Sequence, residues 1–196
     1  MPSVTYLMLR SARRARLEAR TTPLQPLGHA LFHRPGADRH ARPDGPRLPP
    51  DPGGRLTCLI GTIPSPNGIV VDPEETALLI AVTRANQIWR VPLHKSGLVT
   101  KVGIFAHLHG GLGGPDGLAL DSEGCLLVAH EALGSIWRLS PHAEPLDRIV
   151  SCAARATMNL AFGGPDNARL FIAESQTGSI LQADLPTPGL AMFSHS

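Results

Sequence analysis

From Leu56 onwards, apolar residues come in runs of four or five that are separated by glycine, proline and other turn-forming residues. Such runs are typical of β-strands, whereas an amphipathic helix spaces its apolar residues three or four apart. The pattern therefore predicts an all-β structure over the C-terminal two-thirds of the chain. The expected strands span residues 56–63, 68–71, 77–82, 87–92, 102–107, 117–120, 125–130, 135–139, 146–151, 160–162, 169–173 and 179–183.

These strands fall into three repeated units. Each unit begins with a polar residue directly before an apolar strand, at Asn67, Asp116 and Asn159, and these starts lie 49 and 43 residues apart. Trp89 and Trp137 follow the first two starts at nearly equal offsets of 22 and 21 residues. Repeats of about 40–50 residues that contain short strands indicate the blades of a β-propeller.

The N-terminal part of the chain has a different character. Residues 1–55 carry ten arginines against four acidic residues, whereas residues 56–196 carry eight basic and twelve acidic residues. Residues 21–54 are rich in Pro, Arg, His and Gly and show almost no apolar periodicity, so they bury too little surface to offset their ordering entropy. We therefore predict a disordered or irregular basic segment over residues 1–54 and propeller blades over residues 55–196.

Composition excludes several other classes of protein. The three cysteines, Cys58, Cys125 and Cys152, are widely spaced and odd in number, which supports neither a zinc knuckle nor a disulfide framework and favours a reducing, cytoplasmic location. No stretch approaches 18 apolar residues, so we expect no transmembrane helix and no membrane partner. The N-terminal arginines are diluted by proline and lack interleaved aromatic residues, so we expect no nucleic-acid partner.

Two units begin with nearly the same tripeptide, Pro66-Asn67-Gly68 and Pro115-Asp116-Gly117. The first strand of a propeller blade lines the central channel, so both polar side chains would face the channel mouth. An amide oxygen and a carboxylate suit hard cations such as Ca²⁺ or Mg²⁺, and Zn²⁺ also accepts such ligands. The alternative is that both dipeptides are simply turn formers.

The segments PSPNGIVVDPEETALLIAVTRANQIWRVPL and GGPDGLALDSEGCLLVAH, with the C-terminal tail, resemble the senescence-marker protein/gluconolactonase/luciferin-regenerating-enzyme (regucalcin-like) family over about residues 55–196. The resemblance implies part of a six-bladed propeller around one divalent cation, Ca²⁺, Zn²⁺ or Mg²⁺. It implies that Asn67 and Asp116 are metal ligands, that Asp116 is also the catalytic base, and that Asn159 contacts the substrate.

The implied function is the metal-dependent hydrolysis of a small-molecule sugar lactone. In this family the metal polarises the lactone carbonyl and lowers the pKa of a bound water molecule. Asp116 would hold or deprotonate that water.

The chain departs from the family in its N-terminal part. The family carries an acidic metal ligand in a GEGP-like motif and a substrate-binding Asn or Asp in early blades, and residues 1–54 contain neither motif. Three blades are about half of a six-bladed ring, which leaves two blade faces uncovered and open to self-association. The assignment as an enzyme is therefore open, and the alternative is a truncated, catalytically impaired paralogue that keeps only the scaffold and binds its cation weakly.

The origin of the basic segment is a separate hypothesis. If codons are chosen freely, residues 28–50 read one base later can spell a sequence that resembles the family's blade before the PNG motif. The segment would then result from a frame disruption. The coding DNA would test this hypothesis, because codons unable to produce that frame would rule it out.

Overall fold

The computed structural model describes residues 59–94 and 99–191, together with four short strands nearer the N-terminus. These four strands are β1 (Val4–Tyr6), β2 (Met8–Arg10), β3 (Leu17–Ala19) and β4 (Thr22–Pro23). The remainder of the basic segment lies outside the described residues, so its irregular character, its frame-disrupted origin and the domain boundary near residue 54 stay predictions.

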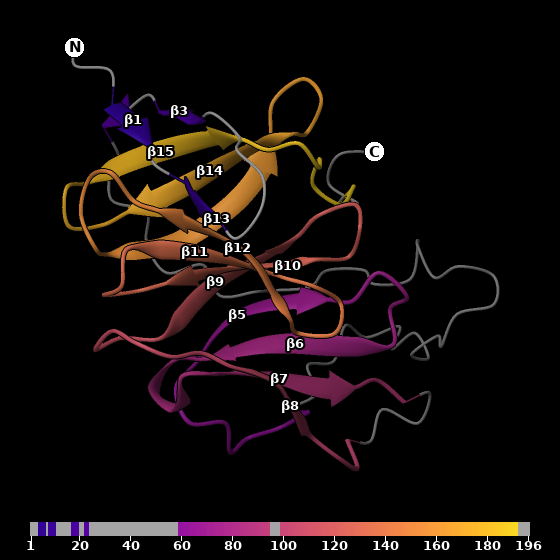
Figure 1. Cartoon of the computed structure of the whole chain (residues 1–196). Coiled ribbons are helices and arrows are strands. Elements are labelled where there is room, and N and C mark those ends of the chain that lie inside the picture. Colours follow the sequence, from indigo (N-terminus) through magenta and orange to yellow (C-terminus); the bar gives the residue numbers. More distant parts are fainter. Residues whose placement is uncertain are drawn as a thin grey trace, which may run out of the picture.

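Three antiparallel sheets follow one another along the chain and stack as three blades (Figure 1). This arrangement confirms the predicted all-β class and the predicted part-propeller architecture. No helix among the described residues has the length and hydropathy needed to cross a membrane. The first blade contains β5 (Pro66–Val71), β6 (Ala77–Val82), β7 (Gln87–Pro92) and β8 (Gly103–His107), with a short 3-10 helix η1 (Thr83–Ala85) between β6 and β7.

The second and third blades repeat this order. The second blade contains β9 (Pro115–Leu120), β10 (Leu126–His130), β11 (Ser135–Leu139) and β12 (Pro145–Val150). The third blade contains β13 (Thr157–Gly163), β14 (Arg169–Glu174) and β15 (Ser179–Asp184).

Strands from the N-terminal segment complete two of these sheets. Strand β4 pairs with β15 and supplies the fourth strand of the third blade, and β2 pairs with β12 as a fifth strand of the second blade. Strands β1 and β3 form a two-stranded sheet of their own. The sequence pattern predicted none of these pairings, because the partners lie far apart in the chain and the segment has little apolar periodicity.

Apolar side chains fill the two spaces between the blades. One cluster lies between the first and second blades and includes Leu79, Ile88, Leu118, Leu126 and Val128, all buried. The other lies between the second and third blades and is built by residues such as Leu127, Ile136, Leu160, Leu170 and Leu181. The second blade is therefore covered on both faces, which fixes the position of its first strand, β9, between β5 and β13.

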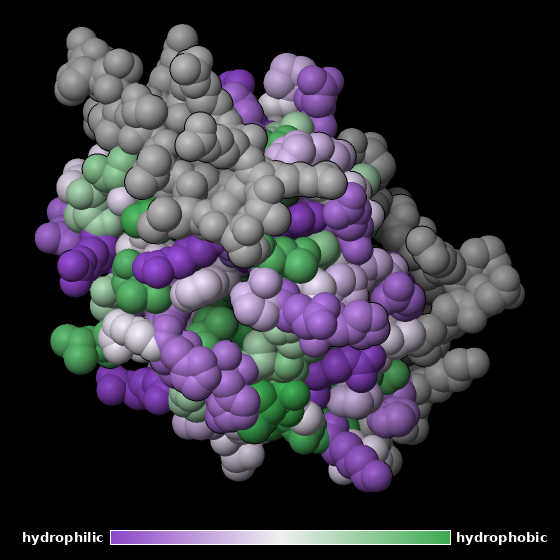
Figure 2. All heavy atoms as spheres, in the orientation of Figure 1, coloured by the Kyte–Doolittle hydropathy of each residue, from purple (hydrophilic) through white to green (hydrophobic). Residues whose placement is uncertain are grey.

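Among the described residues, the first blade is covered by apolar packing on one face only. Ile69, Val71 and Ile104 are 37%, 44% and 51% exposed, and the pairing register aligns them with Ile80, Leu78 and Trp89 of the two middle strands. Figure 2 shows apolar surface on the lower part of the molecule, where the first blade lies. Large apolar side chains that lie exposed and in register on one sheet face mark a surface that can bind another protein surface.

Candidate metal centre

The two repeated tripeptides lie inside strands, at matching β-bulges. In β5, Asn67 and Gly68 face one residue of β6, because Pro66 pairs with Val82 and Ile69 pairs with Ile80. In β9, the pairings of residues 115 and 118 with residues 130 and 128 leave two residues opposite one in the same way. Bulges re-aim side chains and are frequent beside active sites. The structure therefore places neither dipeptide in a simple turn.

The glycine that follows each motif residue allows adjacent blades to approach closely. Gly68 packs against the backbone of residues 116–118 in β9, and a side chain on it would collide with the Asp116 carbonyl oxygen. Gly117 packs in the same way against Asn159 of β13, and a side chain there would collide with the Asn159 amide. The three first strands thus meet at the level of the motif, and the start of each unit lies beside the start of the next.

Asp116 is the buried member of this group. Its residue is 7% exposed, and no described residue donates a hydrogen bond or forms an ion pair with its carboxylate. Burial raises the pKa of Asp116 from 3.8 to about 6, and the negative charge of Glu131 adds to this shift. A buried carboxylate without a donor or a cation is costly, and a bound cation would remove that cost.

Glu131 lies under the loop that leads into β9. The Glu131 backbone N–H donates to the Gly114 carbonyl at 3.0 Å, and the Glu131 side chain fills the space in which a side chain on Gly113 would lie. Glycine at position 113 lets the loop run directly over this carboxylate. The loop therefore holds a second acidic group close enough to Asp116 to influence its pKa.

The two asparagines differ from Asp116 because both are exposed. The Asn67 Nδ2 group donates to the Thr83 hydroxyl at 3.4 Å, and Asn159 Oδ1 accepts from the Leu160 backbone N–H at 2.8 Å. Asn67 therefore keeps its amide oxygen without a donor among the described residues, whereas the Asn159 oxygen is already hydrogen-bonded. On this geometry Asn67 is the better placed of the two to contribute an oxygen ligand.

His130 lies behind the site and is completely buried. Its Nδ1 accepts from the indole N–H of Trp137 at 3.1 Å, so the neutral ring carries its proton on Nε2, which faces the backbone of Gly110 and Gly111. Burial lowers the pKa of His130, the positive charge of Arg148 lowers it further, and the Gly110 backbone opposes the change. The imidazole ring is therefore uncharged near neutral pH, and it packs beneath the loop that contains Gly110 and Gly111.

Thr83, His130 and Glu131 were all missed by the sequence analysis. They lie at or just after the end of the second strand of a unit, opposite the bulge, because Pro66 pairs with Val82 and Pro115 pairs with His130. The available signal was that each second strand is followed at once by a polar residue. Its significance depends on the pairing register, which the sequence pattern alone does not provide.

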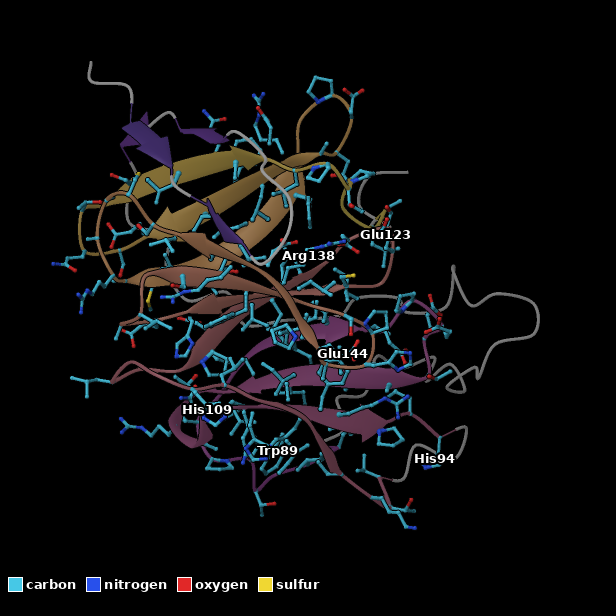
Figure 3. The ribbon with its side chains drawn as sticks, in the orientation of Figure 1. Trp89, His94, His109, Glu123, Arg138 and Glu144 are labelled. Atoms are coloured by element: carbon cyan, nitrogen blue, oxygen red, sulfur yellow. The ribbon has the colours of Figure 1, made fainter. Side chains whose placement is uncertain are left out.

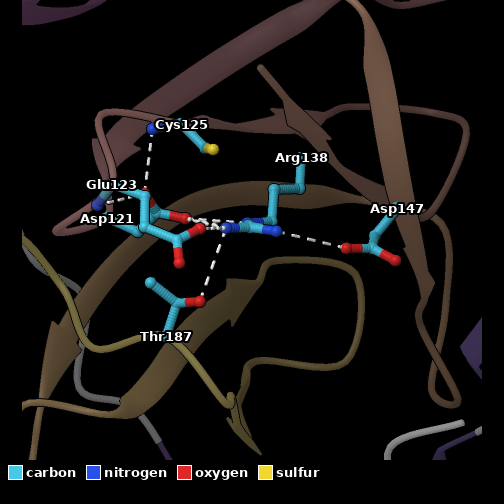
Figure 4. Close-up of polar contacts among 6 residues, drawn as sticks. All are labelled: Asp121, Glu123, Cys125, Arg138, Asp147 and Thr187. Carbon is cyan, nitrogen blue, oxygen red and sulfur yellow. Dashed lines mark hydrogen bonds and ion pairs between the residues drawn. The ribbon is translucent and has the colours of Figure 1, made fainter. Parts of the chain in front are cut away.

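A second acidic cluster lies at the opposite end of β9 (Figure 4). Ligand atoms of Asp121, Glu123 and Cys125 lie within 4.8 Å of one another, which resembles a metal site. Arg138, however, forms ion pairs of 2.7 Å with Asp121 and 2.8 Å with Glu123 (Figure 4), and it lies near Glu123 at this end of the molecule (Figure 3).

The guanidinium group therefore already supplies the positive charge in this cluster. Burial disfavours the charged form of Arg138, but the hydrogen bond and the charge of Asp121 outweigh burial and raise its pKa. Burial, followed by the charge of Asp121, raises the pKa of the Cys125 thiol, which disfavours the thiolate that a metal requires. We interpret this cluster as a structural ion-pair network.

The residues at the bulges fit a hard divalent cation. Within the described part of the chain, Asp116 provides a buried carboxylate without a counter-charge, Asn67 provides an amide oxygen without a donor, and Glu131 adds negative charge nearby. Oxygen ligands of this kind suit Ca²⁺ and Mg²⁺. The identity of the ion and the ligand roles of Asn67, Asp116 and Asn159 remain proposals.

Comparison with known proteins relates this chain to one protein family. The family model described as the SMP-30/Gluconolactonase/LRE-like region matches residues 23–176, and so begins earlier than the motifs that carry the resemblance. The chain is 32% identical over 151 residues to 6-deoxy-6-sulfogluconolactonase of Pseudomonas putida, covering 76% of this chain and 52% of that protein. It is 33% identical over 137 residues to gluconolactonase of Zymomonas mobilis, covering 66% and 37%.

A solved structure agrees with these matches. The crystal structure of a calcium-binding protein, regucalcin, from Agrobacterium tumefaciens superposes with a TM-score of 0.61 at 29% identity, covering 70% of this chain and 51% of that chain. The chain thus spans about half or less of the length of these relatives.

Proposed function

Because this chain belongs to the SMP-30/gluconolactonase/LRE-like family, we propose that it hydrolyses a sugar lactone with the help of one divalent cation. The observation that carries the proposal is Asp116, a buried carboxylate to which no described residue supplies a donor or a counter-charge, at the point where the first strands of the three blades meet. Two relatives are named as lactonases, which makes a lactone the first substrate class to test.

The pKa of Asp116 suits it to accept a proton near neutral pH. A general base works best when its pKa lies near the operating pH, and in the protein without a cation burial raises the pKa of Asp116 to about 6. Above that pH the carboxylate is charged and can hydrogen-bond a water molecule beside it. The family role of Asp116 as catalytic base is therefore compatible with its environment.

The expected reaction is a simple ring opening. When bound, a divalent cation held by Asn67 and Asp116 supplies Lewis-acid polarisation of the lactone carbonyl. The attacking water gives a proton to Asp116 as its oxygen bonds to the carbonyl carbon. The ring C–O bond then breaks, and the proton returns to the departing ring oxygen to give a hydroxy acid. We propose that Asn159, at the start of the adjacent unit, contacts the sugar hydroxyls.

The decisive experiment is lactone hydrolysis by the purified chain with gluconolactone, in the presence of Ca²⁺, Mg²⁺, Zn²⁺ or a chelator. We expect cation-dependent turnover that falls by about 10²–10⁴-fold in Asp116→Asn, since a general base contributes a factor of that size. Asp166→Asn, at an exposed turn position, is the matched control and should keep full activity. Equal turnover by both variants would contradict the assignment of Asp116.

A second candidate function is a non-enzymatic propeller that binds its cation weakly. It is favoured by the length of the match, because the chain spans 52% and 37% of the two lactonases, while the family's early-blade acidic ligand has no counterpart in the motifs found here. Folded, monodisperse protein without turnover in the same assay would replace the enzyme proposal with this one.

Self-association and location are further parts of the proposal. We propose that a second copy covers the open face of the first blade around Ile69, Val71 and Ile104, since the relatives have about twice the matched length. Sedimentation should then report a dimer that Ile104→Lys weakens, and a monomeric wild type would exclude it.

A cytoplasmic location is consistent with the free Cys125 thiol.

A further inference from the structure

Thr83 connects the first two motif residues. It is the first residue of η1, immediately after β6, and its hydroxyl lies 2.8 Å from the Pro115 carbonyl oxygen and 3.4 Å from Asn67 Nδ2. One side chain therefore contacts Asn67 directly and also contacts the residue that precedes Asp116. These contacts join the PNG strand of the first blade to the PDG strand of the second.

The backbone of Thr83 is held from several sides. Its N–H donates to the Ser65 carbonyl at 3.2 Å, and its own carbonyl accepts from the Asn86 N–H at 3.0 Å. Gly114 of the neighbouring blade packs against the same carbonyl so closely that a side chain on Gly114 would collide with it. The hydroxyl is thus presented from a fixed backbone, and its hydrogen bonds have little freedom to rearrange.

The protons at this bridge determine which way the Asn67 amide faces. The Pro115 carbonyl is only an acceptor, so the single hydroxyl proton of Thr83 must be donated to it. The hydroxyl oxygen is then an acceptor toward Asn67, which must present its NH₂ group. The Asn67 Oδ1 atom is therefore directed away from Thr83, and no described residue donates a hydrogen bond to it.

We propose that Thr83 is a positioning residue that orients the Asn67 amide oxygen for the cation also bound by Asp116. This inference rests on the proposed function for the cation itself. Partners that orient a metal ligand without touching the metal typically change metal affinity by about 10–100-fold when removed. Since the bond to Asn67 is long, at 3.4 Å, we expect an effect near the lower end of that range.

Two substitutions separate the hydroxyl from the rest of the side chain. Thr83→Val keeps the shape and removes the hydroxyl, whereas Thr83→Ser keeps the hydroxyl and removes the methyl group. In calorimetric titrations with Ca²⁺, Mg²⁺ and Zn²⁺, Thr83→Val should bind about tenfold more weakly and Thr83→Ser should stay within about threefold of wild type. Equal losses in both variants, or unchanged affinity in Thr83→Val, would overturn the inference.

A matched control removes another threonine hydroxyl from the same blade. The Thr76 hydroxyl donates to Asp72 at 2.8 Å, in the turn between β5 and β6 and away from the bulge. Thr76→Val should lower the free energy of unfolding without changing metal affinity. Urea unfolding of every variant without metal shows whether a change in affinity merely follows a change in stability.

A metal-independent measurement keeps this inference distinct from the proposed function. The side-chain amide signals of Asn67, assigned by their loss in Asn67→Asp, should shift in Thr83→Val and stay in place in Thr83→Ser and Thr76→Val. Unmoved signals in Thr83→Val contradict the bridge. If the signals move but wild type binds no cation, the bridge is supported as an orienting contact and the proposed metal-dependent function fails.

Discussion

A buried aspartate lies at each end of strand β9, Asp116 inside the strand and Asp121 directly after it, and the two have opposite environments. Asp121 is 1% exposed and accepts hydrogen bonds from the backbone N–H groups of Glu123 and Cys125, at 3.0 and 2.8 Å, and an ion pair from Arg138. Asp116 is 7% exposed and receives no hydrogen bond or ion pair from any described residue. A carboxylate buried with its own donors serves the fold, whereas one buried without them is available to a ligand.

The repeat shows the same division of roles in the first blade. Asp72 occupies the position of Asp121, and its carboxylate accepts from the Thr76 and Ala77 backbone N–H groups at 2.6 and 2.9 Å. Arg90 occupies the position of Arg138 and lies 3.6 Å from Asp72, but its side chain is 45% exposed against 17% for Arg138. The second blade, covered on both faces, thus holds the buried version of an ion pair that the first blade exposes.

The largest expected effect comes from removing the partly buried guanidinium of Arg138. Arg138→Met leaves the Asp121 carboxylate buried without a positive charge, which typically costs about 3–5 kcal/mol of unfolding free energy. Urea denaturation followed by tryptophan fluorescence measures it. Cation binding at the opposite end of β9 should be unchanged under all conditions in which the variant is folded. A loss below about 1 kcal/mol would show that the pair behaves as a surface pair.

The next largest effect is a gain in stability, which we expect when the charge of Asp116 is removed. The folded-state pKa of Asp116 is raised from 3.8 to about 6, so the folded protein retains this proton more strongly and loses stability as pH rises through that window. Asp116→Asn lacks this penalty. In the presence of chelator it should therefore be more stable than wild type by up to about 3 kcal/mol at pH 8, and equally stable below the unfolded pKa.

This prediction distinguishes the two aspartates. Removing the charge of Asp116 should raise the free energy of unfolding, whereas breaking the ion pair of Asp121 should lower it. Matched urea curves at pH 8 and near pH 3 provide the test, with Asp166→Asn as the exposed control. Asp116→Asn that is less stable than wild type at pH 8 would mean that Asp116 already has a stabilising partner. Added Ca²⁺ should reduce the difference by stabilising only the wild type.

The smallest expected effect is in the first blade. Arg90→Met removes an exposed pair with a long contact, which should cost less than about 1 kcal/mol and less still at high salt. The measurement is the same urea titration at low and high ionic strength, beside Arg138→Met. If Arg90→Met and Arg138→Met lower the free energy of unfolding by the same amount, coverage by neighbouring blades does not make one ion pair stronger than the other.

Much of the fold was predictable from local pattern. The strands expected at residues 77–82, 87–92 and 135–139 coincide with β6, β7 and β11, because runs of apolar residues between turn formers leave little choice of element. The expected starts at residues 68 and 117 were two residues late, since the bulges carry the PNG and PDG residues inside β5 and β9. Bulges have no clear local signal because they depend on the partner strand.

The sequence by itself determined the strand order, the three units and the recurrence of Asn67 and Asp116 at one position, since these follow from spacing along the chain. Tertiary structure decided which aspartate on β9 receives donors, which strands of the N-terminal segment pair with β12 and β15, and how Thr83 reaches Asn67. Each of these depends on residues far apart in the chain. Local pattern records what a segment can form, whereas burial and charge balance are set by the neighbours that packing brings to it.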